Sequence, residues 1–170
     1  KTEEMIQQYL AEDNQQARSV YDLSKVQRSL GKQKLVFTEL SFDKISYRPG
    51  DDVEIKMKLR SDGERYADLL FGVNISDSMG NCVIHLSNIF LNQINISHRE
   101  EAVYQFRIEG INIKPGRYVV RLFIRANEET QDWIDNTAIL EIDDGNIYSF
   151  ENSQMIQGLV QPRFTFKQIV

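Results

Sequence analysis

The sequence predicts an all-β protein built as a sandwich of two antiparallel sheets. From residue 32 onward, large apolar residues alternate with polar ones at the period of two that a strand with one buried face requires. Proline, glycine, asparagine and aspartate separate these segments at turn positions. Many short strands joined by such turns favour a sandwich of the immunoglobulin or jelly-roll kind, and the sequence leaves open which of the two applies.

The N-terminal residues differ from the rest and predict a short helical linker. Residues 5–10 place four apolar side chains on one face of a helix, and residues 11–19 carry almost no large apolar side chain. A helical spacing then resumes over residues 20–30 before a glycine. We therefore expect a helical linker over residues 1–31, with a second short helix at its end, and one sandwich domain over residues 32–170.

The central strands have the clearest patterns. Residues 53–60 alternate Val, Ile, Met and Leu with Glu, Lys, Lys and Arg, and residues 118–124 place apolar side chains at every second position. A Pro-Gly turn precedes each of these strands. A β-hairpin is expected from residues 69–75 and 82–86 around a turn at residues 77–81. Further strands, which bring the total to about eight, are expected at residues 35–42, 102–108, 138–142 and 164–169.

The composition argues against several classes of partner. The chain has 20 basic and 25 acidic residues, so nothing attracts it to a nucleic acid or to anionic lipid headgroups. No apolar run approaches the roughly 20 residues that span a bilayer, which argues against direct membrane insertion. The single cysteine, Cys82, cannot form a disulfide within the chain, and this favours a reducing, cytoplasmic setting.

The residues that catalysis needs are scarce in this sequence. It contains two histidines and one cysteine, no spacing typical of a zinc site, no phosphate-binding loop and no nucleophile elbow. Pairs of acidic residues at 51–52, 128–129 and 143–144 lie beside turns, where solvated carboxylates are common. We predict no metal, no cofactor and no catalysis, and a two-carboxylate glycosidase is the disfavoured alternative.

A binding site is expected on the outward face of the strands, where Gly72 would leave a depression. Sugars are recognised by aromatic rings that pack on their C–H faces, together with amide, carboxylate and guanidinium groups that reach their hydroxyls. Phe123 and Trp133 are the candidates for stacking, and packing of these rings under a loop or at a dimer interface is the alternative. The polar candidates are Asn74, His85, Ser87, Arg121, Arg125 and Asp135.

Several short segments, taken in order, form a pattern. They are residues 47–53 (YRPGDDV), 71–77 (FGVNISD), 111–120 (INIKPGRYVV), 138–142 (AILEI) and 158–162 (GLVQP). In their order and spacing they resemble the Wzt C-terminal domain, the carbohydrate-binding extension on the ATPase subunit of bacterial O-antigen polysaccharide ABC transporters. The segment EEMIQQY near the N-terminus resembles the closing helix of such ATPase domains.

The resemblance implies a jelly-roll-like sandwich that binds the non-reducing end of a lipid-linked O-antigen polysaccharide in the cytoplasm, at the inner face of the bacterial inner membrane. It implies the ATPase and membrane subunits of the transporter as partners, with ATP and Mg²⁺ bound only by an ATPase domain that precedes this chain. It also implies a homodimer in which residues 163–170 (RFTFKQIV) add to a sheet edge of the partner. A structural dimerisation or adhesin-type sandwich without glycan specificity is the alternative.

Overall fold

The computed structural model describes residues 17–93, 95–145, 147–148 and 158–160, and these residues form nine strands and one short 3₁₀ helix. The elements are β1 (Val20–Asp22), β2 (Leu35–Phe42), β3 (Ser46–Tyr47), β4 (Val53–Ser61), β5 (Leu70–Ser76), β6 (Cys82–Ser87), η1 (Asn88–Leu91), β7 (Glu101–Ile108), β8 (Gly116–Ala126) and β9 (Glu129–Ile142). The strand expected at residues 164–169 lies outside the described residues.

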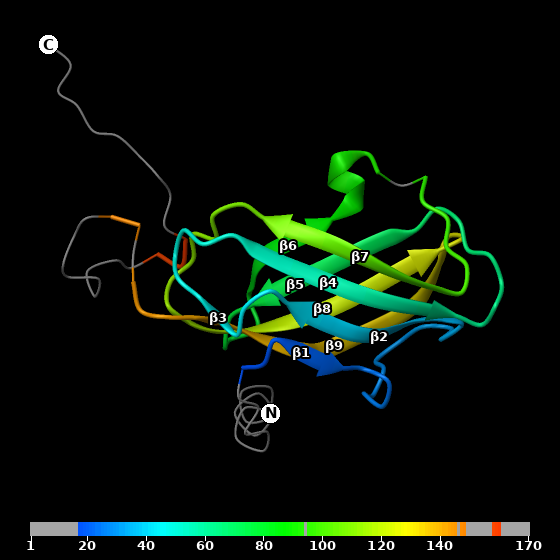
Figure 1. Ribbon diagram of the computed structural model, residues 1–170, viewed down its shortest axis with the longest axis horizontal. Coiled ribbons are helices and arrows are strands. Elements are labelled where there is room, and N and C mark those ends of the chain that lie inside the picture. The colour runs from blue at the N-terminus through cyan, green and yellow to red at the C-terminus, as the bar shows by residue number, and fades with distance from the viewer. Residues whose placement is uncertain (1–16, 94, 146, 149–157, 161–170) are drawn as a thin grey trace, which may run out of the picture.

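The strands form two sheets that pack face to face (Figure 1). The first sheet has the order β1-β2-β4-β7 and the second the order β3-β9-β8-β5-β6. Neighbouring strands are antiparallel except β3 and β9, which run parallel. The two-sheet sandwich predicted from the sequence is confirmed. In the second sheet, β5, β8 and β9 take the places of strands C, F and G of an immunoglobulin domain, and β6 extends their sheet. The first sheet differs from that of an immunoglobulin domain, because β1 extends it beyond β2.

The core lies between the sheets and is made by the inward residues of the alternating strands. Val53, Ile55, Met57 and Leu59 of β4 are all buried, as their spacing predicts. Burial of a side chain of this size contributes about 1.5–3 kcal/mol to the free energy of unfolding, so this alternation is the main source of stability. The inward residues of β8 that face them are Tyr118, Val120, Leu122 and Ile124.

Residues 17–34 form a strap along one side of the sandwich, and the expected second helix over residues 20–30 is wrong. Within the strap, β1 pairs with β2, and both Tyr21 and Leu23 are buried in the core. These contacts lie N-terminal to the expected domain boundary at residue 31. An isolated helix of this length is marginal in water, so strand pairing and core burial decide the conformation. The helix expected over residues 5–10 lies outside the described residues.

A buried ion pair anchors the strap to the second sheet. Nε of Arg28 lies 3.4 Å from Oδ1 of Asp132, whose side chain is fully buried. The Arg28 guanidinium also donates to the carbonyl oxygens of Leu23, Val26 and Phe37. Burial raises the pKa of the Asp132 carboxyl, although a hydrogen bond from the Phe37 N–H and the charge of Arg28 act against this rise. The strap is therefore held by polar as well as apolar contacts.

The last strand, β9, is much longer than the strand expected at residues 138–142 and includes Trp133. Asn127 and Glu128 connect β8 to β9, and both have positive φ, 49° and 65°. Two central residues with positive φ make the type I′ turn that suits a tight hairpin. Glutamate is an unusual residue in such a turn, because asparagine and glycine tolerate this conformation best. For this reason the sequence pattern predicted only residues 138–142 of β9 and not the part of the strand before them.

Candidate functional site

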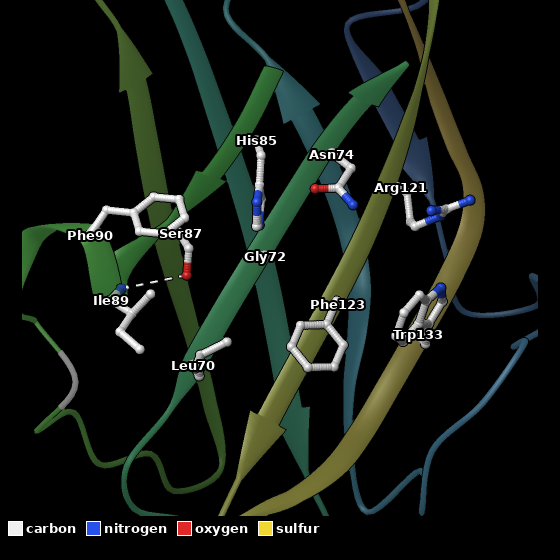
Figure 2. A pocket seen from close by; sticks show the side chains of 10 residues that line it. All are labelled: Leu70, Gly72, Asn74, His85, Ser87, Ile89, Phe90, Arg121, Phe123 and Trp133. Atoms are coloured by element: carbon white, nitrogen blue, oxygen red, sulfur yellow. Dashed lines mark hydrogen bonds between the residues drawn. The ribbon is translucent and has the colours of Figure 1, made fainter. Parts of the chain in front are cut away.

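The outer face of the second sheet carries a pocket of about 260 Å³ (Figure 2). Strands β5, β6, β8 and β9 supply its floor and one wall, and the 3₁₀ helix η1 supplies another wall. The residues that line it are Leu70, Gly72, Asn74, His85, Ser87, Ile89, Phe90, Arg121, Phe123 and Trp133.

The floor of the pocket is a row of outward residues that crosses four strands. Gly72 of β5 lies opposite Ser87 of β6 on one side and Phe123 of β8 on the other, and Phe123 lies opposite Trp133 of β9. A Cβ atom at Gly72 would lie 3.2 Å from Cδ1 of Phe123, so the phenyl ring lies next to the space that a side chain would take. Gly72 is not among the residues with positive φ, so the backbone does not require a glycine there. The missing side chain makes the hollow.

A second row, two residues further along β5, supplies polar groups. Asn74 lies opposite His85 of β6 and Arg121 of β8, and all three side chains point outward (Figure 2). The Oδ1 atom of Asn74 is buried and has no hydrogen-bond partner among the described residues. A buried acceptor without a partner costs about 1–3 kcal/mol. A ligand that brings a hydroxyl or an N–H group to this oxygen would remove that cost.

Two aromatic rings form the wall of the pocket on the β8 and β9 side. The ring centroids of Phe123 and Trp133 are 5.2 Å apart at an angle of 73°, an edge-to-face pair. The indole Nε1–H of Trp133 donates to Oδ1 of Asp135 at 3.0 Å, and the Arg121 guanidinium lies 5.9 Å from the centroid of the Trp133 ring. These contacts hold the indole in one orientation before any ligand arrives.

A β-bulge in β9 places Asp135 beside the pocket. Residues 135–137 of β9 lie opposite the single residue Arg121 of β8, because the pairs on either side of them are in register. A bulge of this kind redirects side chains and breaks the alternation of the strand. As a result, Oδ1 of Asp135 lies 2.7 Å from Nε of Arg121 and forms an ion pair with it.

The charges of Asp135 and Arg121 compensate each other. Burial raises the pKa of the Asp135 carboxyl, but hydrogen bonds from Ser29 and Trp133 and the charge of Arg121 outweigh this effect and hold the pKa below its usual range. Asp135 is therefore ionised at neutral pH. Because both side chains are about 40% exposed, the pair adds little to stability, and its main effect is on the charge of the pocket.

The 3₁₀ helix η1 brings exposed apolar side chains to the rim. Ile89 and Phe90 are 44% and 63% exposed, and the Phe90 ring meets the ring of His85 edge to face at 5.2 Å. Ser87 caps this helix: its hydroxyl donates to the Phe71 carbonyl at 2.7 Å and accepts from the Ile89 N–H at 3.5 Å. Ser87 is itself buried, so its hydroxyl serves to position the helix.

The structure brings most of the predicted site residues together. Arg125 is the exception, since it lies opposite Leu70 and Thr130 and does not line the pocket. Asp135 lies behind the pocket wall and acts through its neighbours. The residues that line the pocket as predicted are Asn74, His85, Ser87, Arg121, Phe123 and Trp133. That these residues bind a glycan stays a prediction.

Sequence reasoning missed the apolar part of the lining. Leu70 has an outward position because Leu69 and Phe71 beside it face inward, so the alternation already placed it on the face of Gly72. Ile89 and Phe90 belong to a short apolar run directly after β6, and large apolar side chains outside a strand are a signal of a surface contact.

Among the residues that the structure describes, no three His, Cys, Asp or Glu side chains converge in a way that would hold a metal ion. None of the helical turns in this part of the chain has the length and apolar character needed to cross a bilayer.

The fold and the pocket define an immunoglobulin-like sandwich with a ligand-sized hollow on the outer face of one sheet. The model of the Wzt C-terminal domain family matches residues 38–162, and the chain belongs to this family. This family is that of a non-catalytic domain of the O-antigen ABC transporter, which agrees with the prediction that the chain is not an enzyme.

Comparison with solved structures gives the same fold. The crystal structure of the C-terminal domain of wzt matches with a TM-score of 0.71 and 14% identity, over 93% of this chain and 98% of that chain. A β-glucuronidase from glycoside hydrolase family 2 matches with a TM-score of only 0.41 and 15% identity, over 67% of this chain and 12% of that chain. A comparison with curated proteins gave no match.

Proposed function

We propose that this domain binds the non-reducing end of a lipid-linked O-antigen polysaccharide and confers substrate recognition on the ABC exporter. The observation that carries the proposal is the combination of a fixed aromatic wall, made by Phe123 and Trp133, with the unpartnered Oδ1 of Asn74 in one pocket. An aromatic face for C–H groups and an acceptor for a hydroxyl are the two things that sugar recognition needs.

The size of the pocket supports recognition of a chain end. Its volume of about 260 Å³ is just below the range of roughly 300–1,000 Å³ that is usual for sites of drug-sized ligands. This is room for one sugar ring and its substituents. The interior of a polysaccharide carries a neighbouring residue on both sides, whereas a terminal residue has one free end to enter the hollow between η1 and the Trp133 wall (Figure 2).

Membership of the family supports a proposed cellular setting for this domain. The domain acts in the cytoplasm, at the inner face of the inner membrane, with the ATPase and membrane subunits of the transporter as partners. The segment N-terminal to the strap leads to an ATPase domain, which alone uses ATP and Mg²⁺, and the sandwich itself needs no cofactor. A homodimer would present two sites and raise the effective concentration of a weakly bound chain end.

Titration calorimetry with the organism's own O-polysaccharide and with an unrelated polysaccharide tests this function. Trp133→Ala and Phe123→Ala should each weaken binding of the native glycan about 10- to 30-fold, as expected for loss of an aromatic anchor in a pocket. Val103→Ala is the matched control, because Val103 is exposed on the outer face of the other sheet. Equal heats with both polysaccharides, or no heat with either, would contradict the proposal.

The same variants separate this function from a purely structural one. If Phe123 and Trp133 serve a dimer interface instead, their replacement by alanine should dissociate the dimer, and sedimentation velocity would show this directly. Retention of the dimer together with loss of glycan binding supports the recognition role.

A further inference from the structure

Residues 29–33 of the strap pair with the strand that carries the aromatic wall of the pocket. The N–H of Ser29 donates to the carbonyl of Trp133 at 2.8 Å, and the N–H of Gln33 donates to the carbonyl of Gln131 at 2.8 Å. Strand β8 pairs with the other edge of β9. The first part of β9 is therefore held from both sides, and the strap supplies one of them.

The same segment also reaches the side chain that fixes the indole. Asp135 accepts from Nε1–H of Trp133 at 3.0 Å and pairs with Nε of Arg121 at 2.7 Å. Burial raises the pKa of the Asp135 carboxyl, but a hydrogen bond from the Ser29 hydroxyl and the contacts with Trp133 and Arg121 outweigh this effect and hold the pKa below its usual range. Trp133 is thus tied to the strap through its backbone and through Asp135.

Close packing at Gly31 sets the distance between the strap and β9. The φ of Gly31 is +124°, in the region that favours glycine, and a Cβ atom there would overlap the backbone of Gln131 and Asp132. These two residues lead directly into Trp133. A displacement of the strap at Gly31 would therefore be passed on to the wall of the pocket.

We propose that residues 29–33 are a positioning element of the pocket, whose pairing with β9 holds the Trp133 indole and the Asp135 carboxylate in the orientation that a ligand meets. These residues do not line the pocket, and they precede residues 38–162, which the family model matches. The inference rests on the proposed glycan binding, but it makes a separate claim, namely that affinity depends on a segment outside the pocket. Because coupling between two sites is reciprocal, occupancy of the pocket also stabilises docking of this segment.

The emission of Trp133 tests the positioning role without any ligand, because Trp133 is the only tryptophan of the chain. In Ser29→Ala the emission should shift to longer wavelength, and acrylamide should quench it more strongly, since the indole gains exposure. Ser29→Thr keeps the hydroxyl and should retain the emission of the unmodified chain. Ser24→Ala is the matched control, because the Ser24 hydroxyl makes the same kind of hydrogen bond to Asp22 in the first half of the strap.

Titration calorimetry with the organism's own O-polysaccharide measures the effect on binding. Ser29→Ala should weaken binding about five-fold, the factor expected for loss of one hydrogen bond. In the background of Asp135→Ala the same substitution should have no further effect, because the carboxylate that Ser29 positions is absent. A loss of stability alone would not depend on the background in this way.

Gly31→Ala is the second variant, with Gly63→Ala as its control. A Cβ atom at Gly63 has nothing within 4 Å, so this control adds backbone strain without a displaced strap. Gly31→Ala should shift the emission of Trp133 and weaken binding more than Gly63→Ala, at urea concentrations where unfolding curves show both variants to be folded.

Hydrogen exchange tests the reciprocal effect of the ligand on the strap. Saturating polysaccharide should slow exchange of the Ser29 and Gln33 amides by about the same five-fold factor, as linkage requires. The Leu23 amide is the internal control, because it donates to Thr38 at 2.9 Å in the first half of the strap, and its exchange should not change.

Two results would overturn the inference: unchanged Trp133 emission in both Ser29→Ala and Gly31→Ala, or equal weakening of binding by Ser29→Ala and Ser24→Ala. If the polysaccharide does not bind the unmodified chain, the proposed function fails. The emission measurements, which need no ligand, then decide by themselves whether the strap positions the indole.

Discussion

Two aspartates of β9, three positions apart, have pKa values shifted in opposite directions because their surroundings differ. Asp132 points into the sandwich, where it is fully buried and paired with Arg28. Asp135 points out at the bulge, where it is partly exposed and holds Arg121 and the Trp133 indole. Burial raises the pKa of the first carboxyl, whereas hydrogen bonds and the charge of Arg121 lower the pKa of the second. One aspartate anchors the fold, and the other shapes the site.

The raised pKa of Asp132 predicts a specific pH dependence of stability. The folded chain holds the proton of this carboxyl more tightly than the unfolded chain, so the stability it contributes is present below its ordinary pKa of 3.8 and is lost as the pH rises through the raised value. Compared with Asp132→Asn, the unmodified chain should lose about 1.4 kcal/mol per pH unit within this window.

Urea unfolding of the unmodified chain and of Asp132→Asn, at a series of pH values, measures this difference. Asp135→Asn is the control with the opposite sign: the pKa of Asp135 is lowered, so its contribution is present above its ordinary pKa and is lost as the pH falls. A difference between the unmodified chain and Asp132→Asn that stays constant with pH would contradict the prediction.

Strands in which buried and exposed residues alternate regularly could be predicted from the sequence. Segments in which a bulge or a helical turn interrupts that alternation could not. The central strands β4, β5 and β8 follow the period of two because every second residue enters the core. In β9 the register shifts at two places, and the neighbours Gln131 and Asp132 are both buried, so the period is lost where Trp133 lies. The pocket was predictable as a set of outward residues, but its wall from η1 depends on a short helix that alternation does not reveal.

The strap was missed for a related reason. The apolar residues Val20, Tyr21, Leu23 and Val26 happen to have a helical spacing. In the structure their partners come from β2 and from the core, which a local pattern does not contain.

Among the contacts between elements, the packing of the strap against β9 depends on Gly31, where the two backbones approach closely. Its φ is +124°, and a Cβ atom there would overlap the carbonyl oxygen of Gln131. Gly31→Ala should therefore lower the free energy of unfolding by more than Gly63→Ala. Gly63 has a similar φ of +100° but faces open space, so its substitution should cost only backbone strain of about 1–3 kcal/mol.

Urea unfolding of these two variants makes the comparison, with hydrogen exchange of the Ser29 and Gln33 amides as a local readout, since both donate to carbonyls of β9. Equal losses of stability in the two variants would show that the strap is not held by close packing at Gly31.

At the scale of the whole molecule, the two outer faces of the sandwich differ in chemistry. The outer face of the first sheet carries charged residues of β4, such as Lys58, which pairs with Glu101 of β7. The outer face of the second sheet carries the pocket with its aromatic wall. The sheets also end in strands with a free edge among the described residues, β7 in the first and β6 in the second, and edges of this kind can accept a strand from another chain.

If the proposed homodimer forms by strand exchange, removal of residues 163–170 should convert a dimer into a monomer in sedimentation velocity. The physical reason is the loss of the segment that would pair with a free sheet edge of the partner. Removal of residues 1–16 is the control and should leave the dimer intact. A dimer that survives the C-terminal truncation would show that strand exchange does not hold it together.

The course of the strap also has a mechanical consequence. The Ser29 N–H donates to the carbonyl of Trp133 at 2.8 Å, and the Ser29 side chain contacts Asp135, so the strap touches the strand that forms the pocket wall. A pull on the chain at residue 17 would act first on the pairing of β1 with β2 and then on the ion pair of Arg28 with Asp132, because both precede Ser29 along the strap. These two contacts therefore shield the pocket wall from tension on the N-terminal side of the strap.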